Sequence, residues 1–146
     1  MEISIFKKIP WPVYLRIISG IGGLGGGLHV LITPVEFIEK IKMFAETTPF
    51  IWYAGILETI FLANPTFAIY LMSLVPILAG IFLISGFCIN LGCVLGILIS
   101  LHYIACQPVQ AIFNLPLIIL ILIVLFSKRS RRYSLDERIF KKFQKS

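Results

Sequence analysis

Charge is scarce in this chain. Charged side chains make up 14% of its 146 residues and hydrophobic ones 58%, whereas soluble domains carry about 25% charged residues. None of the 69 residues from Thr59 to Ser127 is Asp, Glu, Lys or Arg. A soluble fold of this size cannot bury such a run, so the composition excludes a soluble enzyme, a disordered protein and a nucleic-acid-binding domain. We therefore expect an integral membrane protein that forms a single membrane domain over residues 1–146.

Recognisable catalytic and redox motifs are missing as well. The three cysteines, Cys88, Cys93 and Cys106, form no C-x-x-C pair, so paired-thiol redox chemistry lacks its usual motif. The sequence contains no H-E-x-x-H, no carboxylate cluster and no serine-triad pattern. It therefore predicts neither a metal site nor a self-sufficient active site, and the cysteines are expected to act as small buried apolar residues.

The apolar runs predict four membrane-spanning helices. A span needs about 20 mostly apolar residues. The uncharged run is long enough for three spans joined by tight turns, and a fourth apolar stretch precedes it. The expected fold class is therefore an all-α four-transmembrane-helix bundle, with spans at residues 11–33, 65–85, 90–106 and 111–127.

The segment between the first two spans has a different pattern. Apolar residues such as Phe37, Ile41 and Phe44 recur at helical spacing among charged ones, which predicts an amphipathic helix at the membrane surface. Residues 50–62 are apolar but rise only about 20 Å as a helix, less than the roughly 30 Å hydrocarbon core. We therefore expect residues 34–64 to form an outer amphipathic and re-entrant segment over the bundle.

Basic residues gather at both ends of the chain. Residues 1–16 and the tail 128–146 are net basic, while the long middle is net acidic. The positive-inside rule then places both termini in the cytoplasm of a bacterial or archaeal inner membrane and requires an even number of spans. A capping box, Ser134 with Glu137, predicts a short amphipathic helix in the cytoplasmic tail. Candidates for docking lipid or a partner are Arg16, Arg131, Arg132, Ser134, Asp136 and Phe140.

Small residues recur at four-residue spacing in the first and third spans. Glycines at this spacing let helix backbones approach closely in lipid. The alternative is a smooth groove for a flat ligand, such as a quinone ring or a lipid chain. The candidates for helix packing are Gly22, Gly23, Gly26, Gly27, Gly92 and Gly96.

Few ionisable groups lie inside the predicted membrane segments, and each is costly in lipid unless paired. His29 and His102 fall at similar depths near the outer ends of the first and third spans. Together with nearby polar groups they could bind the carbonyls of a quinone headgroup, and two facing imidazoles could ligate a haem or chlorophyll metal. The alternative is that the two rings satisfy different neighbours. The candidate pocket comprises His29, His102, Tyr103, Gln107, Asn114 and Glu58.

Three short motifs occur in a set order along the chain. They are Arg16-x-x-x-Gly20 followed by Gly27, then Gly80 with Gly86, then Tyr133-Ser134-Leu135-Asp136. In this order they resemble the DoxX family of small four-helix membrane proteins. The chain departs from that pattern at Pro76, where the family often has Glu, and at Val30, where it usually has Lys.

The resemblance implies a four-helix membrane fold and a link to quinone-dependent oxidation, because the family includes a membrane subunit of thiosulfate:quinone oxidoreductase. We predict an accessory or anchoring subunit of a larger redox or energy-converting membrane complex that binds quinone or lipid. The alternative is an autonomous quinone-linked oxidoreductase. Expected partners are the bilayer and other membrane subunits, with a homo-oligomer left open. The sequence leaves the cofactor unknown, with quinone as one candidate ahead of haem or chlorophyll.

Overall fold

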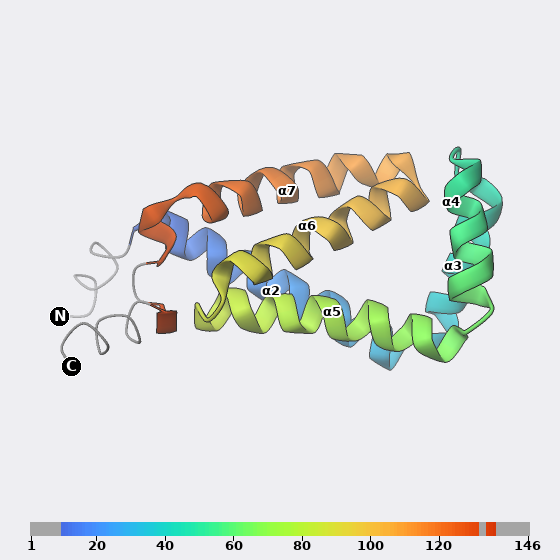
Figure 1. Ribbon diagram of the computed structural model, residues 1–146, viewed down its shortest axis with the longest axis horizontal. Coiled ribbons are helices and arrows are strands. Elements are labelled where there is room, and N and C mark those ends of the chain that lie inside the picture. Colours follow the sequence, from blue (N-terminus) through green and yellow to red (C-terminus); the bar gives the residue numbers. More distant parts are fainter. Residues whose placement is uncertain (1–9, 132–133, 137–146) are drawn as a thin grey trace.

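The computed structural model describes residues 10–131 and 134–136, and within them it contains helices and no β-strand. Consecutive long helices run in opposite directions along the molecule (Figure 1). Each is long and apolar enough to cross a membrane, the last one together with the short 3-10 turn η2 that precedes it. These elements are α2 (Trp11–Ile32), α5 (Pro65–Ser85), α6 (Ile89–Cys106), η2 (Pro108–Gln110) and α7 (Ala111–Phe126).

The ends of these helices follow local chemistry. Helix α5 begins at Pro65, whose missing N–H costs nothing at a helix start. It ends at Gly86, which adopts the left-handed conformation with φ 71°. Cys88 is also left-handed, with φ 50°, and precedes the first residue of α6. Two left-handed residues thus reverse the chain within three positions between α5 and α6.

The four long helices form a ring in which each packs against two neighbours: α2 against α5 and α7, and α6 against α5 and α7. The outward faces are apolar, as Ile18, Ile112 and Phe113 illustrate at 61%, 70% and 73% exposure. Such a surface indicates a membrane protein in contact with lipid, in agreement with the four predicted spans.

The segment between α2 and α5 lies across one end of the bundle (Figure 1), and we call this the capped end. It consists of α3 (Pro34–Thr47), α4 (Ile51–Ile56) and the π-helical segment η1 (Leu57–Leu62). Its apolar face buries Phe37, Ile41, Phe44, Leu57 and Phe61 in one cluster with α5 and α6. The amphipathic helix expected here is thus observed as α3.

The opposite end, here called the terminal end, holds the start of α2 and the end of α7 (Figure 1). The short helix η3 (Lys128–Arg131) also lies there, in contact with α2. Leu135 and Asp136 are helical and follow Ser134, but the rest of the predicted tail helix, with Phe140, lies outside the described residues. So does Arg132, and the side chain of Arg131 is not described.

Candidate functional site

A cavity of about 140 Å³ lies at the centre of the bundle, lined by all four long helices. Small residues on α2 leave room for it, because Gly22, Gly23 and Gly26 contribute no side chain to its wall. The α5 wall is apolar and includes Ala79 and Leu83. Four hydrogen-bonding side chains complete the lining, and none of them is charged: Ser19, Ser100, Tyr103 and Asn114.

The hydroxyl of Ser19 distinguishes this cavity from ordinary helix packing. Ser100 Oγ donates to the Gly96 carbonyl at 2.9 Å, and Asn114 Nδ2 donates to the Gln110 carbonyl at 2.9 Å. Ser19 is 7% exposed, yet its Oγ has no hydrogen-bond partner among the described residues. A buried hydroxyl without a partner costs about 1–3 kcal/mol. A molecule that supplies a hydrogen-bonding atom beside Ser19 would remove this cost.

A second cavity of about 260 Å³ lies at the capped end, between α2, α3 and the end of α6. It brings together three of the predicted site residues, His29, Tyr103 and Gln107. Tyr103 also lines the central cavity, so the two cavities adjoin at this side chain. Sequence reasoning missed Lys40, which lines the same pocket from α3. The only sequence feature that could have identified Lys40 as a pocket residue was its place on the polar side of an amphipathic helix.

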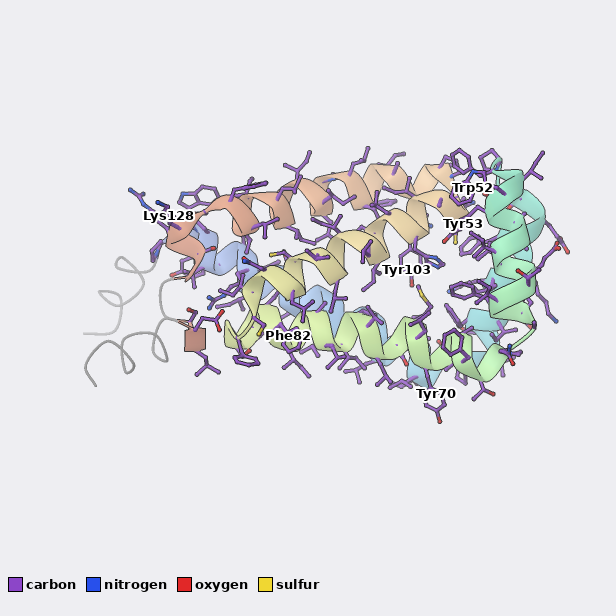
Figure 2. All side chains as sticks on the ribbon, in the orientation of Figure 1. Trp52, Tyr53, Tyr70, Phe82, Tyr103 and Lys128 are labelled. Carbon is purple, nitrogen blue, oxygen red and sulfur yellow. The ribbon has the colours of Figure 1, made fainter. Side chains whose placement is uncertain are left out.

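His102 has different surroundings from His29. The Tyr53 hydroxyl bonds to its Nδ1, and its Nε2 lies 3.6 Å from Cys106 Sγ. The ring stacks on Phe61 with 5.4 Å between centroids. Figure 2 shows Tyr53, which belongs to α4 of the cap, beside the end of α6. His102 therefore connects the cap to α6, and metal ligation by it would require breaking one of these contacts.

The remaining predicted pocket residues are divided between the two cavities and the surface. Asn114 lines the central cavity. Glu58 is exposed at the start of η1 and lines neither cavity. Burial, and then the nearby Cys106, raises the pKa of Tyr53 above its ordinary value. The phenol is thus protonated at neutral pH and can hydrogen-bond the imidazole.

The glycines on α2 fall into two groups. A Cβ added at Gly23 would lie 2.9 Å from the Pro76 carbonyl oxygen, and one at Gly27 would lie 2.5 Å from that of Ser73. These two positions therefore require glycine for the close contact with α5. A Cβ at Gly22 or Gly26 would meet no atom within 4 Å. Gly22 and Gly26 therefore make no close helix contact within this chain, and they line the central cavity.

Helix α6 uses its two glycines for contact. A Cβ at Gly92 would lie 3.0 Å from Phe82 Cβ, and one at Gly96 would lie 3.0 Å from Ile121 Cδ1. The α2–α5 contact contains a further pair, because a Cβ at Gly80 would lie 2.6 Å from the Gly20 carbonyl oxygen. Spacing alone did not identify this pair, although both glycines belong to the short motifs that carry the DoxX resemblance.

Arg16 is buried at the terminal end, 2% exposed, and its Nη1 donates to the Ser130 carbonyl at 2.8 Å. The Asp136 carboxylate accepts hydrogen bonds from the backbone N–H groups of Cys88 and Ile89, at 3.1 and 3.5 Å, where α6 begins. Ser134 is fully buried. Arg16 and Asp136 thus make internal hydrogen bonds at the terminal end, beside the buried Ser134. A role of these residues in docking stays a prediction.

Several residues that carry the DoxX resemblance meet in two places, while Tyr133 lies outside the described residues. A Cβ added at Gly86 would lie 2.6 Å from Ser134 Cβ and 2.8 Å from Arg16 Nη1, and the Asp136 N–H donates to the Gly86 carbonyl at 3.2 Å. The other motif glycines lie in the α2–α5 contact. The motifs therefore have a shared structural role, which is to join α2, α5 and the C-terminal segment.

Side chains that commonly bind metals do not cluster in the described part of the chain. Among the described residues, no group of three His, Cys, Asp or Glu side chains could hold a metal ion. All three cysteines are described, and none forms a disulfide. No protein-family model matches the chain, and neither a curated protein nor a solved structure matches it. Family membership therefore stays a prediction from the order of the motifs.

Proposed function

We propose that this chain is a membrane-embedded subunit that binds a quinone in its central cavity and serves a larger redox or energy-converting assembly. The observation that carries the proposal is the buried Ser19 hydroxyl, which has no partner among the described residues and lines a largely apolar cavity between four helices. Sites for small molecules are typically apolar, with a few placed polar groups.

A quinone fits the chemistry of this cavity. Its ring is flat, apolar and uncharged, and its carbonyl oxygens accept hydrogen bonds. The backbone at Gly23 carries no side chain and leaves room for a ring, and Ser19 offers a donor. Tyr103 and Asn114 add polar groups from α6 and α7. A saturated lipid chain would also fill the space, but it would leave the Ser19 hydroxyl without a partner.

A subunit is better supported than an autonomous oxidoreductase. Of the side chains that line the central cavity, only the Tyr103 phenol can exchange a proton, so electron and proton donors would have to come from a partner. The outward faces of the helices offer apolar area for lipid or another membrane subunit. The proposal includes the inner membrane of a bacterium or archaeon, with both termini in the cytoplasm.

The test uses the full-length chain purified in mild detergent. Organic extraction should recover quinone in proportion to protein, and added decylubiquinone should bind saturably. Ser19→Ala should weaken this binding about two- to tenfold, the effect of one hydrogen bond. Ser73→Ala is the matched control, because its fully buried hydroxyl bonds within α5 and does not line the cavity.

Two results would contradict the proposal. One is the lack of saturable quinone binding by the wild-type protein in detergent and in lipid nanodiscs. The other is equal affinity of the wild-type and Ser19→Ala proteins, because the hydroxyl would then have no role in binding. An absorbance spectrum of the purified protein tests the haem and chlorophyll alternatives in the same preparation.

A further inference from the structure

We infer that the ligand enters the central cavity sideways from the bilayer, through an opening beside Gly22 and Gly26 on α2. This inference rests on the proposed function, and it concerns the route and the class of ligand. Of the residues that line the cavity, these two glycines are the exposed ones, while the others are buried or half-buried. The cavity therefore reaches the surface of the bundle at this point.

The opening lies at a depth where the surroundings are lipid chains. Gly22 falls halfway along the 22-residue helix α2. At about 1.5 Å per residue it lies roughly 16 Å from the start of a span that crosses a hydrocarbon core of about 30 Å. A molecule reaches this opening only from solution in the bilayer. A charged molecule is disfavoured there because of its desolvation cost.

Nothing in the described part of the chain closes the opening. A Cβ at Gly22 or Gly26 would meet no atom within 4 Å, whereas one at Gly23 or Gly27 would strike the backbone of α5. The first pair lies on a different flank of α2 from the second, because consecutive helical residues are rotated by about 100°. Since the other neighbour of α2 in the ring is α7, the opening faces the junction of α2 and α7.

Ser19 supplies the reason for a molecule to stay once it has entered. It lies one helical turn before Gly22 and lines the cavity, and its buried Oγ has no hydrogen-bond partner among the described residues. The opening and the hydroxyl together select a lipid-soluble, uncharged molecule with a flat body and a hydrogen-bonding atom at its edge.

The experiment follows labelling by a photoactivatable azidoquinone in nanodiscs that contain the full-length chain. The label is added to the lipid phase, samples are illuminated at successive times, and peptides from α2 and α6 are quantified by mass spectrometry. Gly22→Leu and Gly26→Leu should each slow the rise of labelling at least fivefold, with a smaller effect on the final level. Both should fold normally, since a Cβ added at either position meets open space and leucine favours helix.

Gly25→Leu is the matched control. It changes the same helix in the same way, and its added Cβ would also meet open space, but Gly25 does not line the cavity. Its labelling should follow the wild-type time course. Its thermal unfolding, compared with that of the two test variants, verifies that all three proteins are folded.

Four results would overturn the inference, and they have different meanings. Wild-type rates in both test variants would place the entrance elsewhere, while binding at Ser19 would still stand. An equal fall in rate and final level would mean that the leucine occupies the binding volume rather than its entrance. A change from dimer to monomer in the test variants would assign this face to a second copy of the chain. No saturable labelling of the wild-type protein would overturn the proposed function as well.

Discussion

A Cβ added at Gly27 would lie 2.5 Å from the backbone carbonyl oxygen of Ser73. Real side chains do not reach this separation, so α2 and α5 can keep their spacing only with glycine at this position. The carbonyl belongs to the backbone of α5 and cannot rotate away as a flexible side chain could. In lipid, where burial of apolar surface does not drive helix association, this close approach is a main source of bundle stability.

Gly27→Leu is therefore expected to destabilise the bundle. Overpacking a well-packed contact typically costs about 1–3 kcal/mol, and here a backbone must move, so the upper end of that range is expected. The measurement is the midpoint of thermal unfolding of the purified protein in detergent. Gly25→Leu serves as the control, since its added Cβ would meet no atom within 4 Å. Equal midpoints for the two variants would show that the α2–α5 contact is looser than the structure indicates.

Removal of Arg16 should loosen the terminal end. Its Nη1 donates to the Ser130 carbonyl, within the short helix that follows α7. A hydrogen bond from a charged group is worth about 1.5–3 kcal/mol, and Arg16→Ala should lower the free energy of unfolding by that amount. Limited trypsin digestion should also cut faster after Lys128 and Arg129. Arg129→Ala, at an exposed position, should change the unfolding free energy by less than about 0.5 kcal/mol. If Arg16→Ala changed neither the free energy of unfolding nor the rate of trypsin cleavage, Arg16 would not hold the terminal end together.

The positions of the spans could be predicted from the sequence because apolar length and turn residues are one-dimensional signals. The span predicted at 65–85 coincides with α5, and each of the other three predicted spans differs from its helix by one residue at one end. Pro65 and Gly86 mark the two ends of α5 in the sequence, because proline favours helix starts and glycine favours helix ends. Amphipathic spacing likewise revealed α3, because its apolar face must cover the bundle.

Helix rotation could not be predicted in the same way. Spacing treats Gly22 with Gly26 and Gly23 with Gly27 as equivalent pairs. In the structure a Cβ on the first pair would meet no atom within 4 Å, whereas the second pair packs on α5. Similar depth suggested that His29 and His102 share a pocket, but the contacts of His102 with Tyr53 and Phe61 depend on the fold of the cap. Ser19 gave no sequence signal, since a single serine in an apolar helix is usual.

Both termini are expected on the cytoplasmic side of the membrane. The start of α2 and the end of α7 lie at the same end of the bundle (Figure 1), and the tail 128–146 is rich in basic residues. A reporter that is active only in the cytoplasm should give a signal when it is fused to the N-terminus and also when it is fused to the C-terminus. A matched fusion of a periplasm-specific reporter within residues 48–50, in the cap, should be active. Signal from a periplasmic reporter at the C-terminus would contradict the four-span topology.

The burial of the Tyr53 phenol should give the protein a specific sensitivity to alkaline pH. Burial raises the pKa of Tyr53 above its ordinary value of 10.0. Below pH 10 the phenol is protonated in both the folded and the unfolded chain, so its ionisation does not affect stability. Above pH 10 the unfolded chain loses the proton while the folded chain keeps it. Unfolding is then favoured by up to about 1.4 kcal/mol per pH unit.

Tyr53→Phe removes both the hydrogen bond and this ionisation. At pH 7 the variant should be less stable by about 0.5–1.5 kcal/mol, because the imidazole loses its partner. Between pH 9 and 11, however, its stability should fall less steeply than that of the wild-type protein. The control is Tyr70→Phe, which removes a phenol that is 56% exposed on α5 and should keep the wild-type slope. Lysine deprotonation affects all three proteins alike and cancels in the comparison. Parallel pH profiles for wild-type and Tyr53→Phe would mean that the Tyr53 phenol is solvated, and the cap would then not be fixed to α6 through His102.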